Sequence, residues 1–210
     1  MSHVVRLVGI GKTFVRGRTE IVVLDGLEAQ VSQGEVVIIR GRSGSGKTTL
    51  LNILAGWQEP DRGEVTWGID EPESWSEVAV VPQSLGLLPE LTLGENISLP
   101  GRLADQESDV PRIANHLEIP HLLGRPVDGA SLGEQQRSAI GRALIQRPAL
   151  LLADEPSSHQ DLERLHLVWR LISEVAAEGT AVIAATHDPD AFAYADRILD
   201  LQEGRLVQAD

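Results

Sequence analysis

The sequence predicts an α/β fold with an inserted helical segment, and three observations support this prediction. Short apolar runs typical of buried parallel strands occur at 36–39, 78–81, 149–153 and 180–185. A glycine-rich loop follows the first run and leads into a helix-like stretch. Between 84 and 144, short helix-like pieces alternate with prolines and no run is strongly strand-like. The length of 210 residues suits one such domain.

The composition limits the classes of function. Eighteen lysines and arginines stand against 31 aspartates and glutamates, which gives a formal net charge of −13. This balance argues against a nucleic-acid-binding surface and against loose adsorption to anionic lipid. The absence of cysteine excludes disulfides and thiolate metal sites, and it fits a reducing cytosol. No apolar run approaches the length of a membrane span, and the first residues lack a signal-peptide layout, so we expect no direct membrane insertion.

Two strands are expected near the N-terminus, over 4–8 and 21–31, around a loop that contains Gly17. Phe14 lies just before this loop in a chain with few aromatic residues. Two interpretations of Phe14 are open. It either packs as an ordinary strand residue or provides a platform on which a nucleobase stacks.

A phosphate-binding loop follows the strand at 36–39. Residues 41–49 have the spacing G-x-x-x-x-G-K-[ST], whose glycines let successive N–H groups point into one concavity. The start of the next helix adds the positive end of its dipole. Lys47 can reach the outer phosphates, and the Thr48 hydroxyl is placed to ligate Mg²⁺. The residues predicted to bind nucleotide here are Gly41, Arg42, Ser43, Gly44, Ser45, Gly46, Lys47, Thr48 and Thr49.

The middle of the chain begins with a turn at 60–63, a short strand at 64–67 and the buried strand at 78–81, which ends at Pro82-Gln83. An apolar cluster within 85–91 is either core of the helical insert or a face that binds a partner.

A capping box, S-x-x-E, runs from Ser131 to Glu134 and predicts a helix over about 132–146. The pattern can mean only a well-capped helix. It can also mean a second anion site, because a helix N-terminus with a serine hydroxyl suits phosphate.

Two carboxylates, Asp154 and Glu155, follow the apolar strand at 149–153. Ligands of α/β sheets bind at this end of the strands. Adjacent strand residues point in opposite directions, so the two acids should have different tasks. We expect Asp154 to hold Mg²⁺ through its water shell and Glu155 to act as the base for an attacking water.

The last third of the chain completes the same edge. A helix is expected from Asp161 to about 177, where Gly179 ends it, followed by a strand over 180–185. His187 follows this strand, at the same edge as Asp154 and Gly41, which favours a contact with the γ-phosphate. The runs 197–201 and 205–207 predict a terminal hairpin.

This ordered series resembles the ATP-binding subunit of ABC transporters. The phosphate loop matches Walker A, and 149–155 matches Walker B with its catalytic glutamate. Gln83 matches the Q-loop, His187 the switch histidine, and Phe14 the adenine-stacking aromatic. The resemblance implies a P-loop NTPase (RecA-like) core over about 1–83 and 145–210. It also implies an antiparallel β subdomain within that core and a helical subdomain over about 84–144.

The resemblance further implies an ATPase that uses ATP and Mg²⁺. Two chains, in a homodimer or a heterodimer, face head to tail in this family, and each ATP lies between Walker A of one chain and the Ser131 helix of the other. The implied partner is an integral-membrane permease, whose coupling helix docks near Gln83 and the helical insert. The implied place is the cytoplasmic face of the cell membrane. The implied catalytic residues are Glu155, His187 and Gln83, the implied metal residues are Thr48, Gln83 and Asp154, and the implied residues of the second half-site are Ser131, Gly133 and Glu134.

Two landmarks depart from the family pattern. The signature L-S-G-G-Q/E is here Ala-Ser-Leu-Gly-Glu over 130–134, and the D-loop, commonly S-A-L-D, is Ser-His-Gln-Asp over 158–161. Both departures concern how tightly and how symmetrically two chains close. Within the family, the run L-L-P-x-L-T-x-x-E-N-x-x-L-P over 87–100 is similar to the lipoprotein-release and macrolide-export branch.

Three other functions are compared with the sequence. A GTPase switch would need an N-K-x-D guanine motif, which this sequence lacks. Soluble ABC ATPases of DNA repair or translation typically carry a coiled-coil insert or two cassettes, and this sequence has neither. A nucleotide-gated regulator of a membrane or cell-wall partner stays open because of the altered signature, although Glu155 and His187 argue against it.

Overall fold

The computed structural model describes residues 3–70, 72, 74 and 76–208. The strands are β1 (His3–Arg16), β2 (Thr19–Ser32), β3 (Val36–Arg40), β4 (Arg62–Trp67), β5 (Val78–Val81), β6 (Leu150–Asp154), β7 (Ala181–Ala185), β8 (Arg197–Gln202) and β9 (Arg205–Gln208). The helices are α1 (Lys47–Leu54), α2 (Leu93–Leu103), α3 (Val110–His116), α4 (Leu132–Leu144) and α5 (Leu162–Ala177). Short 3₁₀ turns lie at Pro120–Leu122, Val127–Gly129 and Pro189–Tyr194.

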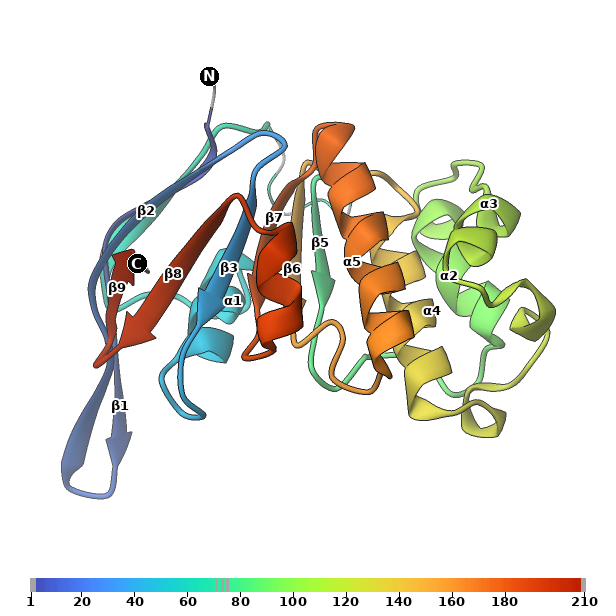
Figure 1. Cartoon of the computed structure of the whole chain (residues 1–210). Helices are drawn as coiled ribbons and strands as arrows, with labels where there is room; N and C mark the ends of the chain where they lie inside the picture. Colours follow the sequence, from blue (N-terminus) through green and yellow to red (C-terminus); the bar gives the residue numbers. More distant parts are fainter. Residues whose placement is uncertain (1–2, 71, 73, 75, 209–210) are drawn as a thin grey trace.

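The central sheet has the order β5-β6-β7-β3-β8-β9, in which only β9 runs antiparallel to its neighbour. Its strands bury alternate residues on opposite faces, as the period of two requires. Ile38 and Leu151 join the apolar cluster that contains α5 and the helical segment, whereas Ile39 and Leu150 join the cluster that contains α1, β1 and β2. Figure 1 shows α5 across one face, α2 and α3 beyond the β5 edge, and the β1–β2 hairpin at the opposite end. The predicted α/β fold is confirmed.

A second sheet, with the order β2-β1-β4, is antiparallel throughout. Here the expected strands at 4–8 and 21–31 were too short. The pairing of β1 and β2 continues to a turn at 17–18, so Phe14 lies within a strand. The register of the pair shifts on both sides of Ile10, and Gly9 has a φ of 63°. These irregularities break the regular alternation on which a sequence-based assignment depends.

The segment 84–144 is helical as expected, and α4 ends at Leu144, two residues before the expected end. Its interior belongs to the same apolar cluster as α5 and one face of the sheet. The division into core and helical subdomain stays a prediction. In the part of the chain that the structure describes, no helix is both long enough and apolar enough to cross a membrane.

Candidate nucleotide site

The phosphate loop, the acidic pair and His187 meet at one edge of the central sheet. In the parallel register, Ile39 of β3 and Asp154 of β6 both pair with Ala185 of β7. The loops that follow these three strands therefore leave the sheet at the same level. The expectation that Gly41, Asp154 and His187 share an edge is confirmed.

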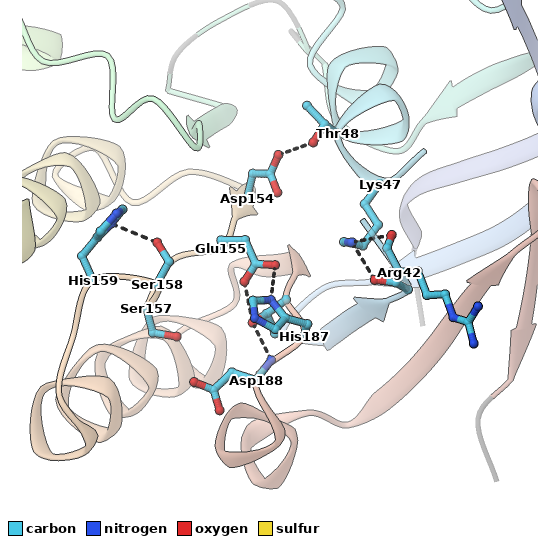
Figure 2. A network of polar contacts seen from close by, with 12 residues as sticks. Arg42, Lys47, Thr48, Asp154, Glu155, Ser157, Ser158, His159, His187 and Asp188 are labelled. Carbon is cyan, nitrogen blue, oxygen red and sulfur yellow. Dashed lines mark hydrogen bonds and ion pairs between the residues drawn. The ribbon is translucent and has the colours of Figure 1, made fainter. Parts of the chain in front are cut away.

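The phosphate loop turns directly into α1 at Gly46, which is the N-cap residue with a φ of 105°. A Cβ at Gly46 would lie 2.8 Å from Cγ1 of Val23, so the close approach of β2 also requires glycine. No side chain caps α1 and its first turn carries no acidic residue, so backbone N–H groups and the helix dipole are left to hold an anion. Lys47 Nζ donates hydrogen bonds to Gly41 O at 2.8 Å and to Arg42 O at 3.4 Å, which holds the ammonium over the loop (Figure 2).

Thr48 and Asp154, which lie 106 residues apart in sequence, are joined by a hydrogen bond. Thr48 Oγ1 donates to Asp154 Oδ2 at 2.6 Å (Figure 2). Burial raises the pKa of the Asp154 carboxyl, the Thr48 hydrogen bond opposes the rise, and the neighbouring Glu155 charge adds to it. Thr48, Asp154 and Gln83 line one cleft of about 450 Å³.

The donors in this cleft suit a magnesium ion bound together with a nucleotide. The described residues contain no cluster of three or more His, Cys, Asp or Glu side chains that could form a closed metal site. A hydroxyl, an amide and one carboxylate are few ligands. Mg²⁺ keeps several waters and takes its remaining oxygens from phosphates, so this sparse oxygen set fits it.

Glu155 points away from Asp154 and toward the strand end of β7. Its backbone has a φ of 53°, uncommon for a non-glycine residue. Its carboxylate accepts hydrogen bonds from Thr186 Oγ1 at 3.0 Å and from His187 Nδ1 at 2.8 Å (Figure 2). The Glu155 side chain is 13% exposed, whereas that of His187 is 75% exposed. These two hydrogen bonds hold the carboxylate in place. Thr186 is not predictable from the sequence, because a threonine at a strand end carries no distinctive pattern.

Phe14 stands on β1 with 40% of its surface exposed. Lys12 Nζ lies 5.9 Å from the centre of its ring and also donates to Asp61 Oδ1 at 2.8 Å. Because Val23 of the paired strand contacts Gly46, the hairpin that carries Phe14 begins directly beside the phosphate loop. A partly exposed aromatic ring on a rigid strand is suited to stacking, and this role of Phe14 stays a prediction.

The residues of the second half-site lie apart from the phosphate loop of their own chain (Figure 1). Figure 1 shows α4 on the other side of β6 from the β3–α1 loop. Ser131 N donates to Glu134 Oε2 at 2.8 Å, and Glu134 N donates to Ser131 Oγ at 3.4 Å, so the predicted capping box is present. The hydrogen bond from Ser131 N–H lowers the pKa of the Glu134 carboxyl. Ser131 and Leu132 at the start of α4 are exposed, and Gly133 packs on the loop that follows Glu155 rather than on the phosphate loop.

The comparisons with known proteins decide the family. The ABC transporter family profile matches residues 24–158. The chain belongs to this family. The cassette is 37% identical over 216 residues to the lipoprotein-releasing system ATP-binding protein LolD of Pseudomonas syringae pv. tomato, covering 95% of each chain. It is 33% identical to the macrolide export ATP-binding/permease protein MacB of Chlorobaculum tepidum, covering 97% of the cassette and 33% of MacB.

The solved structures agree with the sequence comparisons. An ATP-binding cassette in a dimeric, post-hydrolysis state bound to ADP and Pi superposes with a TM-score of 0.90 at 28% identity, and 98% of our chain and 97% of that chain are covered. The cassette described here is an ATP-binding ABC ATPase, the ATP-binding subunit of an ABC transporter. The predicted family, P-loop NTPase fold and ATPase activity are confirmed.

Replacing Asp154 with asparagine should separate stability from function. Asparagine can still accept the Thr48 hydrogen bond. It removes the Asp154 carboxylate, whose raised pKa shows that its negative charge is less stable in the folded chain than in the unfolded chain. We expect the Tm of the metal-free and nucleotide-free protein to rise by about 2–4 °C at neutral pH, and Mg²⁺-dependent ATPase activity to be lost.

The raised pKa of Asp154 also determines how the gain in Tm depends on pH. The destabilisation by Asp154 develops as the pH rises from the ordinary aspartate range through the raised pKa, so the gain in Tm should shrink toward acidic pH. Thermal unfolding measured over pH checks this, with the exposed Asp70→Asn as the control. A lower Tm for Asp154→Asn at neutral pH would contradict the conclusion that burial of the charged Asp154 carboxylate destabilises the fold.

Proposed function

We propose that this ABC ATPase closes as an ATP-bound dimer beneath an integral-membrane permease of the lipoprotein-release and macrolide-export type, at the cytoplasmic face of the cell membrane. One observation carries the proposal. The edge around Walker A holds groups suited to the phosphates, the metal and the attacking water, while the capped start of α4 packs on the loop after Glu155 and lies on the other side of β6 from the phosphate loop (Figure 1). A second chain, identical or related, would supply the missing helix end.

In this proposal the adenine stacks on Phe14, and residues 41–49 hold the phosphates. Mg²⁺, held by Thr48, Gln83 and Asp154, would neutralise charge on the phosphate oxygens. The Glu155 carboxylate accepts a proton from the attacking water, and Thr186 and His187 orient that carboxylate. His187 is exposed, so it can also approach the γ-phosphate.

Ser131 and Gly133 of the partner chain would face the same phosphates. The Glu134 carboxylate is held in the capping box, so we assign it the task of fixing the helix start. The dimeric ADP-bound cassette among the similar structures supports this arrangement. Opening of the dimer after hydrolysis would transmit force, with the core over about 1–83 and 145–210 moving against the helical subdomain over about 84–144.

An apolar groove of about 380 Å³ is the proposed docking site for the permease. Its lining includes Trp57, which has 61% of its surface exposed, together with Leu88, Leu99 and Ala143. Asn96 is fully buried and fixes the Leu88 segment, since its side chain accepts from Leu88 N at 2.8 Å and donates to Leu88 O at 3.0 Å. The run shared with the lipoprotein-release branch therefore shapes one wall of this groove.

The experiment compares Leu88→Ser with Leu103→Ser. Both remove an exposed leucine, but Leu88 lines the groove and Leu103, which is 66% exposed, does not. ATPase activity is measured with and without the candidate permease in lipid vesicles. We expect the permease to stimulate the unmodified ATPase and Leu103→Ser, and to have much less effect on Leu88→Ser. Equal stimulation of both variants would contradict the docking site.

The second candidate is a nucleotide-gated regulator that controls a membrane or cell-wall partner without transport. Leu132 favours it, because a leucine with 56% of its surface exposed stands where the family signature has glycine. A regulator would bind ATP and dimerise but show no ATPase stimulation by any permease. The same vesicle measurement therefore separates the two functions.

A further inference from the structure

The loop between β6 and α5 contains Gln160, at one of the positions where the chain departs from the family's D-loop pattern. Both ends of its side-chain amide bond to α4. Gln160 Nε2 donates to Gly133 O at 2.9 Å, and Gln160 Oε1 accepts from Arg137 Nη1 at 2.8 Å. The leucine that commonly occupies this position in the family could make neither bond.

Gln136 makes the reciprocal connection from α4 to the loop. It is 1% exposed, and its Nε2 donates to the backbone oxygen of Glu155 at 2.7 Å. Its Oε1 accepts from His159 N at 3.1 Å and from Gln160 Nε2 at 3.3 Å. Two glutamines thus interlock the first turns of α4 with the segment that carries Glu155.

The packing around the glutamines leaves little room for adjustment. A Cβ at Gly133 would lie 2.8 Å from His159 O, so the first turn of α4 rests on the loop backbone. Arg137 is 8% exposed, and burial lowers the pKa of its guanidinium. Among the described residues, Gln160 is the side chain that hydrogen-bonds to this buried guanidinium. Loss of the Gln160 amide would leave a buried charge without that partner.

We infer that Gln160 is a positioning residue that fixes the start of α4 relative to Glu155. The inference rests on the proposed dimer, in which α4 of a chain faces its partner's ATP while Glu155 serves the chain's own ATP. The Gln160–Gln136 clamp then joins the two nucleotide sites through one rigid connection. Its loss loosens the half-site presented to the partner and leaves the chain's own phosphate loop intact.

The test uses Gln160→Met, which keeps the length of the side chain and removes both hydrogen bonds. Gln160→Glu keeps an acceptor for Arg137 and removes the donor to Gly133 O. Gln106→Met is the control, because Gln106 is exposed in the α2–α3 loop. Each substitution is made alone for turnover and ADP binding, and together with Glu155→Gln for ATP-driven dimerisation in the ultracentrifuge.

We expect Gln160→Met to need about tenfold more ATP for half-maximal dimerisation and turnover, with an intermediate shift for Gln160→Glu. ADP affinity of the monomer and the result for Gln106→Met should match the unmodified chain, which a general loss of folding would not produce. Unchanged ATP dependence of both Gln160 variants would overturn the inference alone. Failure of the chain with only Glu155→Gln to dimerise with ATP would overturn the proposed dimer and the inference with it.

Discussion

Replacing Glu155 with glutamine should lower ATPase turnover by about 10²–10⁴-fold and trap the ATP-bound dimer. Glutamine has the same shape. Its amide oxygen can accept the hydrogen bond from His187 while its amide nitrogen donates to the Thr186 hydroxyl, so the backbone at this strand end should not move. What it lacks is a carboxylate able to take the proton of the attacking water. Because ATP would remain uncleaved between two chains, the dimer that hydrolysis normally opens would persist.

Single-turnover release of phosphate measures the chemical step, and size-exclusion chromatography with ATP and Mg²⁺ measures the trapped dimer. Glu64→Gln provides the control, because this glutamate is exposed on β4 of the other sheet. A steady ATPase rate in Glu155→Gln would remove Glu155 as the base. The search would then turn to the other groups at the same sheet edge, with the exposed imidazole of His187 first.

Features that are local in sequence were predictable. The phosphate loop, the strands at 36–39, 78–81 and 180–185 and the capping box at Ser131 each depend on residues a few positions apart, and the structure has them within one residue. The shared sheet edge was also predictable, because consecutive parallel strands of one sheet present their carboxyl ends together.

Features that depend on distant partners were not predictable. Thr186 approaches Glu155 across 31 positions, and Gln160 reaches Gly133 across 27. No local pattern marks either partner, because a single hydrogen bond between two loops imposes no periodicity. The full length of the β1–β2 hairpin was not predictable for a different reason, because its bulges interrupt the alternation of apolar residues.

The negative net charge of the chain makes the phosphate loop important for binding ATP. An ABC ATPase with a net charge of −13 must bind a polyanion against the field of the whole chain. Local sources of positive potential must therefore dominate at this edge. They are the backbone N–H groups at the start of α1, the helix dipole and the ammonium of Lys47.

Replacing Lys47 with methionine should consequently weaken ATP binding by about 100-fold while the fold is kept, because a charged hydrogen bond to phosphate is among the strongest that a side chain makes. Lys47→Arg should fail to restore affinity, since a planar guanidinium is larger than the compact ammonium that Gly41 O and Arg42 O hold over the loop. Equilibrium titration with a fluorescent ATP analogue measures the affinities, with Arg102→Met on the exposed side of α2 as the control. Full affinity in Lys47→Met would mean that the backbone N–H groups and the α1 dipole suffice to hold the phosphates, and that the lysine acts only after binding.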